Sequence, residues 1–151
     1  MDKIQYKNFK AENLITYRSE MTPIELQLRL SMIYKYIYEN DAKKINSLIT
    51  ITNSIDKKTK ASDTEILLPI NKEIPSSMGY LFVETFYFNN AIMIRHKGNP
   101  ANILNTYLTL MQEAIIAGHK LIPPLCQVYI FEPENEEDLD DFEIEIYAKI
   151  K

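Results

Sequence analysis

Two stretches of the chain carry apolar residues at steps of four, three and four, which places them on one face of an α-helix. The second stretch begins 77 positions after the first. Each follows a helix-capping residue and a proline, Thr22-Pro23 and Asn99-Pro100, and proline loses no hydrogen bond at the first helical position. We therefore predict two amphipathic helices in the same phase. Their core-facing positions are Leu26, Leu30, Ile33 and Ile37 in the first and Ile103, Tyr107, Leu110 and Ala114 in the second.

The ends of both predicted helices also carry recognisable signals. Glu25 stands three residues after Thr22, the spacing of a capping box. Asn40-Asp41 marks the end of the first helix, and Gly118 fits the left-handed position after the second. The ten residues that precede each helix align at the same offset of 77, with identical residues at Ile15 and Ile92, at Arg18 and Arg95, and at the two prolines.

Strand-like patterns surround each predicted helix. A long β-rich run precedes it, and two shorter ones follow it, which makes each half a βαββ unit. We predict one α+β domain over residues 1–151, formed by two βαββ halves with pseudo-twofold symmetry, whose antiparallel sheet carries both main helices on one face. The predicted first repeat covers about 1–70, the linker 71–79, and the second repeat about 80–151. The predicted strand runs are 4–18, 45–53 and 64–70, then 80–95, 125–132 and 142–150.

Charge is distributed unevenly along the chain. Nine of the 21 acidic residues lie between 132 and 145, where there is no basic residue, and the other 12 face 17 basic ones. This acidic run lacks the glycine and ligand spacing of a calcium loop, so we interpret it as solvated, with docking to a basic partner as the alternative. We do not expect the chain to bind nucleic acid, because phosphate binding needs clustered Lys and Arg. With one cysteine, no apolar run at the N-terminus and no stretch long enough to cross a bilayer, we expect a cytoplasmic protein that does not enter membranes.

The alternation of side chains along the last two predicted strands indicates a binding face. In the last strand, Glu143, Glu145, Tyr147 and Lys149 oppose an apolar face, and in the preceding strand Gln127 and Tyr129 share a face. We predict that Gln127, Tyr129, Glu145 and Tyr147 converge on the side of the sheet away from the helices. Such a set suits a small aromatic or amphipathic ligand, and the alternative is ordinary packing of tyrosines across strands. The full predicted ligand set is Gln127, Tyr129, Glu145, Tyr147, Tyr107 and Phe88.

Catalytic and metal signals are weak. His96 and His119 have no Cys or carboxylate at a metal-ligand spacing, so we predict no metal site and no cofactor. Cys126 lies on the apolar face of its strand and is expected to be a buried, inert thiol. The three glycines are too far apart to form a phosphate loop. Without an activated nucleophile or a placed acid–base pair, we do not expect an enzyme.

The runs 91–100, 127–133 and 143–147, together with Tyr107, resemble the gyrase-inhibitor-like, or effector-binding, superfamily, which is related to the SOUL proteins. The resemblance implies two βαββ halves with a site for a small, often cationic and aromatic, molecule between them. In that superfamily a central glutamate commonly stands where this chain has Gln127. An amide cannot neutralise a bound cation or act as a catalytic acid, so this departure argues against hydrolysis.

The segments 4–8 and 65–70 also resemble a family of small bacterial proteins associated with type VII secretion gene clusters. That resemblance implies an accessory or partner-binding role. The sequence therefore supports two hypotheses for the function. The first is a non-enzymatic small-molecule-binding domain with its site between the halves. The alternative is a protein-interaction module that kept the fold, lost the pocket and binds a partner with a basic surface.

Overall fold

The computed structural model describes residues 4–151, apart from the side chain of Glu136. This part of the chain divides into two structural units. We call Lys10–Tyr87 the α1 unit, and residues 4–9 together with Phe88–Lys151 the α2 unit. Each contains one main helix and four antiparallel strands, so the predicted α+β class is confirmed. None of the helices in the described residues is long and apolar enough to cross a membrane.

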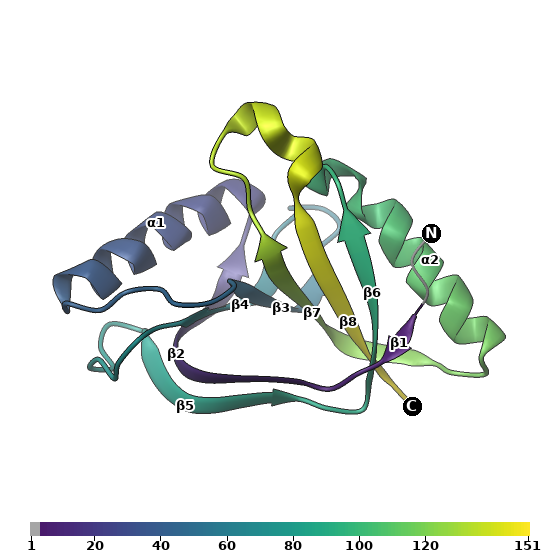
Figure 1. Cartoon of the computed structure of the whole chain (residues 1–151), viewed down its shortest axis with the longest axis horizontal. Coiled ribbons are helices and arrows are strands. Elements are labelled where there is room, and N and C mark those ends of the chain that lie inside the picture. The colour runs from purple at the N-terminus through teal and green to yellow at the C-terminus, as the bar shows by residue number, and fades with distance from the viewer. Residues whose placement is uncertain (1–3) are drawn as a thin grey trace. The chain divides into compact units, whose positions relative to one another are not determined.

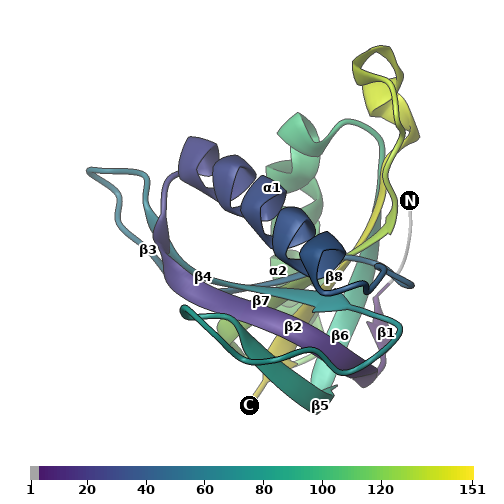
Figure 2. The same cartoon turned by 90° about the vertical axis from the view of Figure 1, so that its left-hand side faces the viewer.

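The α1 unit holds β2 (Phe9–Met21), α1 (Pro23–Glu39), β3 (Ile49–Ile55), β4 (Ser62–Pro69) and β5 (Leu81–Phe88). The end residues Phe9 of β2 and Phe88 of β5 already belong to the α2 unit. Its strands lie in the order β3-β4-β2-β5. Figure 2 shows α1 lying across the strands of its own unit. The buried residues of the helix are Ile33 and Ile37.

The α2 unit holds β1 (Gln5–Tyr6), β6 (Ala91–Lys97), the short 3-10 turn η1 (Pro100–Asn102) and α2 (Ile103–Ile116). It continues with β7 (Leu121–Phe131), the 3-10 segment η2 (Glu136–Asp141) and β8 (Glu143–Ile150). Its strands lie in the order β1-β6-β8-β7. Figure 1 labels these elements, with α2 in green and β8 in yellow.

The two units repeat the same internal topology. β2, α1, β3 and β4 correspond in chain order to β6, α2, β7 and β8, and the strand orders β3-β4-β2 and β7-β8-β6 match. The buried positions Ile33 and Ile37 in α1 correspond at offset 77 to the buried Leu110 and Ala114 in α2. The predicted βαββ repeat and the predicted helix phase are therefore confirmed.

The helix ends follow the predicted caps with one exception. Thr22 and Glu25 form a reciprocal capping box at 3.3 and 2.9 Å. After α2, the amide of His119 donates to Ala114 (2.8 Å) and that of Gly118 to Ile115 (3.0 Å), a Schellman motif with Gly118 at φ 82°. The α-helix, however, begins at Ile103 and not at Pro100. Asn99 caps a 3-10 turn instead, because its side chain accepts from the amide of Ala101 at 2.9 Å.

Both long β-rich runs are broken in two. The run 4–18 separates into β1 and β2, and the run 80–95 separates into β5 and β6 around Asn90, whose φ is 56°. β1 pairs with β6, whereas β5 is a neighbour of β2. Each unit therefore takes its outer strand from the other half of the sequence, and the unit boundaries differ from the repeat boundaries expected at 71–79. The single-domain organisation itself stays a prediction.

Candidate functional site on the helix-free face of the α2 unit

Two pairs of residues define a polar and aromatic face of the α2 unit. In the β6–β8 register, Arg95 lies opposite Glu145 and Met93 lies opposite Tyr147. Residues directly opposite each other in an antiparallel pair point to the same side. The alternate residues of both strands, including Ile94 and Ile146, form a core cluster with Leu110 and Ala114 of α2. Glu145 and Tyr147 therefore lie on the side of the strands that α2 does not cover.

Glu145 is a buried carboxylate with a full set of partners. Only 4% of the residue is exposed. Its Oε1 accepts from the Tyr147 hydroxyl at 2.7 Å, and its Oε2 accepts from Nη2 of Arg95 at 2.9 Å. Nζ of Lys7 is 3.5 Å from the same Oε2. Buried charges persist in proteins when they are paired and hydrogen-bonded in this way.

The protonation states follow from these contacts. Burial raises the pKa of Glu145, but hydrogen bonds from Tyr147 and Arg95 and the charges of Lys7 and Arg95 together lower its pKa below the ordinary value. Burial, followed by the hydrogen bond to Glu145, raises the pKa of Tyr147 well above its ordinary range. At neutral pH the pair is therefore an ionised carboxylate and a neutral phenol that donates to it.

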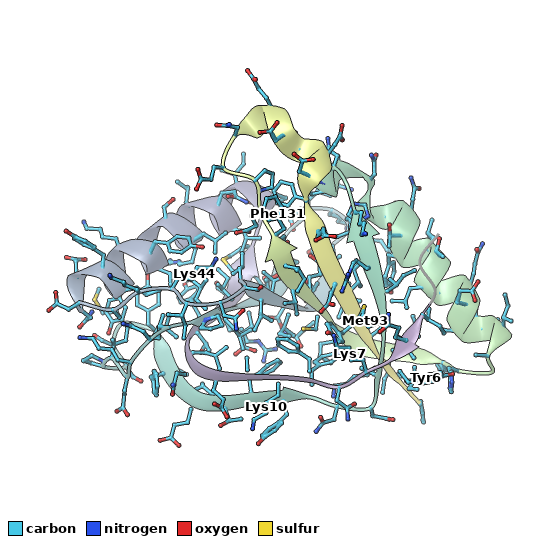
Figure 3. The ribbon with its side chains drawn as sticks, in the orientation of Figure 1. Tyr6, Lys7, Lys10, Lys44, Met93 and Phe131 are labelled. Carbon is cyan, nitrogen blue, oxygen red and sulfur yellow. The ribbon has the colours of Figure 1, made fainter. Side chains whose placement is uncertain are left out.

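Aromatic rings surround the Glu145–Tyr147 pair. The ring of Tyr147 lies 5.5 Å from that of Phe9 and 6.4 Å from that of Phe88, centre to centre. Two cations lie over these rings, Nζ of Lys7 at 6.0 Å from Tyr147 and Nζ of Lys149 at 4.5 Å from Phe88. Figure 3 labels Lys7 just past β1 and Met93 on β6, the strand that pairs with β1. We call Lys7, Phe9, Phe88, Arg95, Glu145, Tyr147 and Lys149 the Glu145 cluster.

Three predicted site residues belong to this cluster and three do not. Phe88, Glu145 and Tyr147 lie together, but Gln127 and Tyr129 pair in register with Ile146 and Ile144 and so point to the helix side. There the Tyr129 hydroxyl donates to Oε1 of Gln127 at 3.1 Å. Tyr129 and Tyr107 both pack against the core cluster under α2.

The predicted convergence of Gln127 and Tyr129 with Glu145 and Tyr147 on one face is therefore wrong. Alternation within each strand was predicted correctly, but it leaves the phase of β7 relative to β8 undetermined. Cys126 and Val128 are the β7 residues that share the side of Tyr147 and Glu145. Both are buried, which makes β7 apolar on the face that was expected to be polar.

Four members of the Glu145 cluster were missed: Lys7, Phe9, Arg95 and Lys149. A signal for Arg95 was present, because the sequence repeat aligns it with Arg18. Arg18 lies opposite Glu65 in the β2–β4 register, as Arg95 lies opposite Glu145. Lys7 and Phe9 come from the other end of the chain, and only the pairing of β1 with β6 brings them here.

The histidines and the cysteine take structural roles. The ring nitrogens of His96 contact the Thr106 hydroxyl at 2.6 Å and the Asn99 carbonyl at 3.0 Å. His119 contacts the Tyr6 hydroxyl at 2.8 Å. Cys126 is buried, as predicted, and burial raises the pKa of its thiol well above the ordinary value. Within residues 4–151 as described, no group of three His, Cys, Asp or Glu side chains could hold a metal ion.

No protein-family model matches the sequence, and no curated protein matches it. The structure, however, is similar to solved ones. It superposes on the EcmrR C-terminal domain with a TM-score of 0.76 at 17% identity, over 100% of this chain and 98% of that domain. The chain therefore has the gyrase-inhibitor-like fold. It also superposes on EcmrR as seen in its DNA complex in EcmrR-RPo, with the same TM-score of 0.76 at 18% identity. This match covers 99% of this chain and 57% of the EcmrR chain.

Two further structures share the fold at lower similarity. A hydrolase from Listeria innocua matches with a TM-score of 0.60 at 11% identity, over 97% of this chain and 93% of that one. SAV2435 bound to tetraphenylphosphonium matches with a TM-score of 0.53 at 7% identity, over 100% of this chain and 94% of that one. None of these names refers to type VII secretion, so that suggestion gains no support.

Proposed function

We infer that this chain is a non-enzymatic, effector-binding-like domain that takes a small molecule at the Glu145 cluster. The observation that carries this proposal is the buried Glu145–Tyr147 pair beside the rings of Phe9 and Phe88. Rings supply contact area at small entropic expense, and a few fixed polar groups orient a ligand. The fold shared with EcmrR and with tetraphenylphosphonium-bound SAV2435 supports the same function.

The chemistry of the cluster favours binding over catalysis. A general acid or base works best with a pKa near the operating pH. Both Glu145 and Tyr147 have pKa values displaced away from neutrality, the first downward and the second upward. Each oxygen of the carboxylate is also engaged by a partner. The absence of enzymatic activity stays a prediction, since one similar fold is that of a hydrolase.

A thermal-shift screen of aromatic compounds, followed by calorimetric titration of the hits, tests this proposal. Phe9→Leu removes a half-buried ring that contacts Tyr147 and should weaken binding of a hit by about tenfold. Tyr6→Leu is the matched control, because Tyr6 lies in the same segment but its ring contacts His119. Equal loss in both variants, or loss in neither, would show that the ligand does not bind at the Glu145 cluster.

A second candidate function, a protein-interaction module, has its own observation. The outer side of α2 carries exposed apolar residues at steps of four, three and four, the spacing of a helix-packing seam. In the same unit, η2 carries acidic side chains, although that of Glu136 lies outside the described residues. Leu108→Glu should abolish capture of a protein partner with a basic surface. Neutralising the acidic residues of η2 should make that capture insensitive to salt. The seam residues are Leu104, Leu108, Met111 and Ile115.

Nucleic acid is the partner that needs a separate test. EcmrR is a protein that forms a complex with DNA, and this chain corresponds to 57% of it. The expectation that the chain itself does not bind nucleic acid stays a prediction. A filter-binding titration with duplex DNA checks it, and salt-sensitive binding by this chain would contradict it.

A further inference from the structure

Charge, more than shape, distinguishes the Glu145 cluster as a binding site. We propose that it selects an anionic aromatic molecule, such as an aromatic carboxylate or sulfonate, over a cationic one. This inference rests on the proposed function, because it names the ligand class of the same site. The juxtaposition behind it is two basic side chains, Lys7 and Arg95, on the Glu145 carboxylate, with a third, Lys149, over the neighbouring Phe88 ring.

The carboxylate is already neutralised from within the chain. Oε2 of Glu145 is 2.9 Å from Nη2 of Arg95 and 3.5 Å from Nζ of Lys7, while Oε1 accepts from Tyr147. A cationic ligand recognises such a site by pairing with the carboxylate and lying over an aromatic face. The Lys7 ammonium already does both, because it also lies over the Tyr147 ring at 6.0 Å. A cationic ligand would therefore have to displace Lys7 and would be repelled by Arg95.

Lys7 and Arg95 together carry one positive charge more than the single carboxylate that they share. Arg95 and Lys7 keep 40% and 44% of their side chains exposed, whereas that of Glu145 keeps 5%. The remaining cation, Lys149, donates to the carbonyl of Asn89 at 3.2 Å and lies over Phe88. The accessible part of the cluster is thus basic, and its single acid is buried. Charge-assisted hydrogen bonds to a ligand anion are about twice as strong as neutral ones.

The next pair along the same strands does not change this balance. Lys97 lies opposite Glu143 in the β6–β8 register, and their charged atoms are 3.7 Å apart. One basic and one acidic group cancel at the far end of the face. Among the charged residues of β6 and β8, the excess of cations therefore lies in the part of the face that also carries the Phe9, Phe88 and Tyr147 rings.

Two probes of almost the same shape and opposite charge test the proposal. Tetraphenylborate and tetraphenylphosphonium are titrated calorimetrically into the wild-type chain at low and at moderate salt. We expect the borate to bind at least about tenfold more tightly, with a preference that decreases as salt is added. Equal binding, or tighter binding of the phosphonium, would overturn the anion preference and leave ligand binding at the cluster standing. If neither probe binds, both this inference and the proposed function fail.

Variants separate the site from general attraction of anions to lysines. Lys7→Gln should weaken borate binding several-fold and strengthen phosphonium binding, because the internal cation is gone while the carboxylate stays. Lys10→Gln is the matched control, since Nζ of Lys10 pairs with Glu12 at 3.2 Å and lies over Tyr87. The same effect in both variants would contradict a specific role of Lys7. Unchanged circular dichroism of both variants verifies that they fold.

Discussion

Arg95 faces Glu145 across the β6–β8 pair and donates to its carboxylate at 2.9 Å. The repeat contains an equivalent pair, Arg18 opposite Glu65 in the β2–β4 register, with a different outcome. Arg18 turns to Asp63 and forms two hydrogen bonds at 2.8 and 3.0 Å. Burial raises the pKa of Glu65 more than Arg18 lowers it, whereas the pKa of Glu145 is lowered. Of the two opposed Arg–Glu pairs, Arg95 and Glu145 thus form an ion pair across their strands, whereas Arg18 pairs with Asp63 instead of Glu65.

This difference predicts that the same substitution has different effects on stability in the two units. Glu145→Gln leaves Arg95 and Lys7 facing an amide and should lower the free energy of unfolding by about 2 kcal/mol. Glu65→Gln relieves a half-buried carboxylate of its charge and should leave that free energy unchanged or slightly higher. Urea denaturation of the two variants measures both. Similar destabilisation by the two substitutions would contradict the assigned pairing.

The pH dependence of stability gives a second prediction. The folded pKa of Glu145 lies below its ordinary value of 4.5, so its contribution is complete above pH 4.5 and is lost as pH falls through the folded pKa. The difference in unfolding free energy between wild type and Glu145→Gln should therefore shrink below pH 4.5. All other groups titrate in both proteins and cancel in this comparison. A difference that stays constant on acidification would show that Glu145 has an ordinary pKa in the folded state.

Two tyrosine hydroxyls provide a matched pair for a third prediction. Tyr147→Phe removes the donor to a buried carboxylate and should destabilise the fold by about 1–2 kcal/mol and raise the pKa of Glu145. Tyr129→Phe removes a hydroxyl that bonds to the Gln127 side chain on the helix side. Only the first change should alter the affinity for tetraphenylborate. The measurements are urea denaturation and calorimetric titration, and an effect of Tyr129→Phe on affinity would return the site to the helix side.

Gly118 gives a prediction about the repeat's second helix. A Cβ at this position would meet no atom within 4 Å, but its φ of 82° strains any other residue. Gly118→Ala should therefore destabilise the chain by about 1 kcal/mol through the backbone alone. Ala117→Gly, one residue earlier in right-handed conformation, is the control for a general change in flexibility. Thermal unfolding of both variants checks this, and a neutral Gly118→Ala would contradict the assigned cap.

The helices could be predicted well from the sequence because caps and period are local signals. Thr22, Glu25 and Gly118 act as expected, and Ile33, Ile37, Leu110 and Ala114 are the buried helix residues. The start of α2 was missed by three residues, since Asn99 can cap a 3-10 turn as well as an α-helix.

The candidate site could be predicted only in part because it depends on pairing between strands. Alternation along β8 correctly separated Glu145 and Tyr147 from Ile144 and Ile146. It could not fix which residues of β7 share their side, since shifting the register by one residue exchanges the two faces. The role of Lys7 could not be predicted for a similar reason, because its neighbours in the fold are more than 80 positions away in the sequence.

The six methionines offer a direct test of where a ligand binds. Met93 is buried opposite Tyr147 in the Glu145 cluster's face, whereas Met111 lies on the exposed seam of α2. With ¹³C-labelled methionine methyl groups, titration of tetraphenylborate followed by NMR should shift the Met93 signal and leave that of Met111 in place. A shift at Met111 with none at Met93 would contradict binding at the Glu145 cluster and favour the α2 seam as the functional surface.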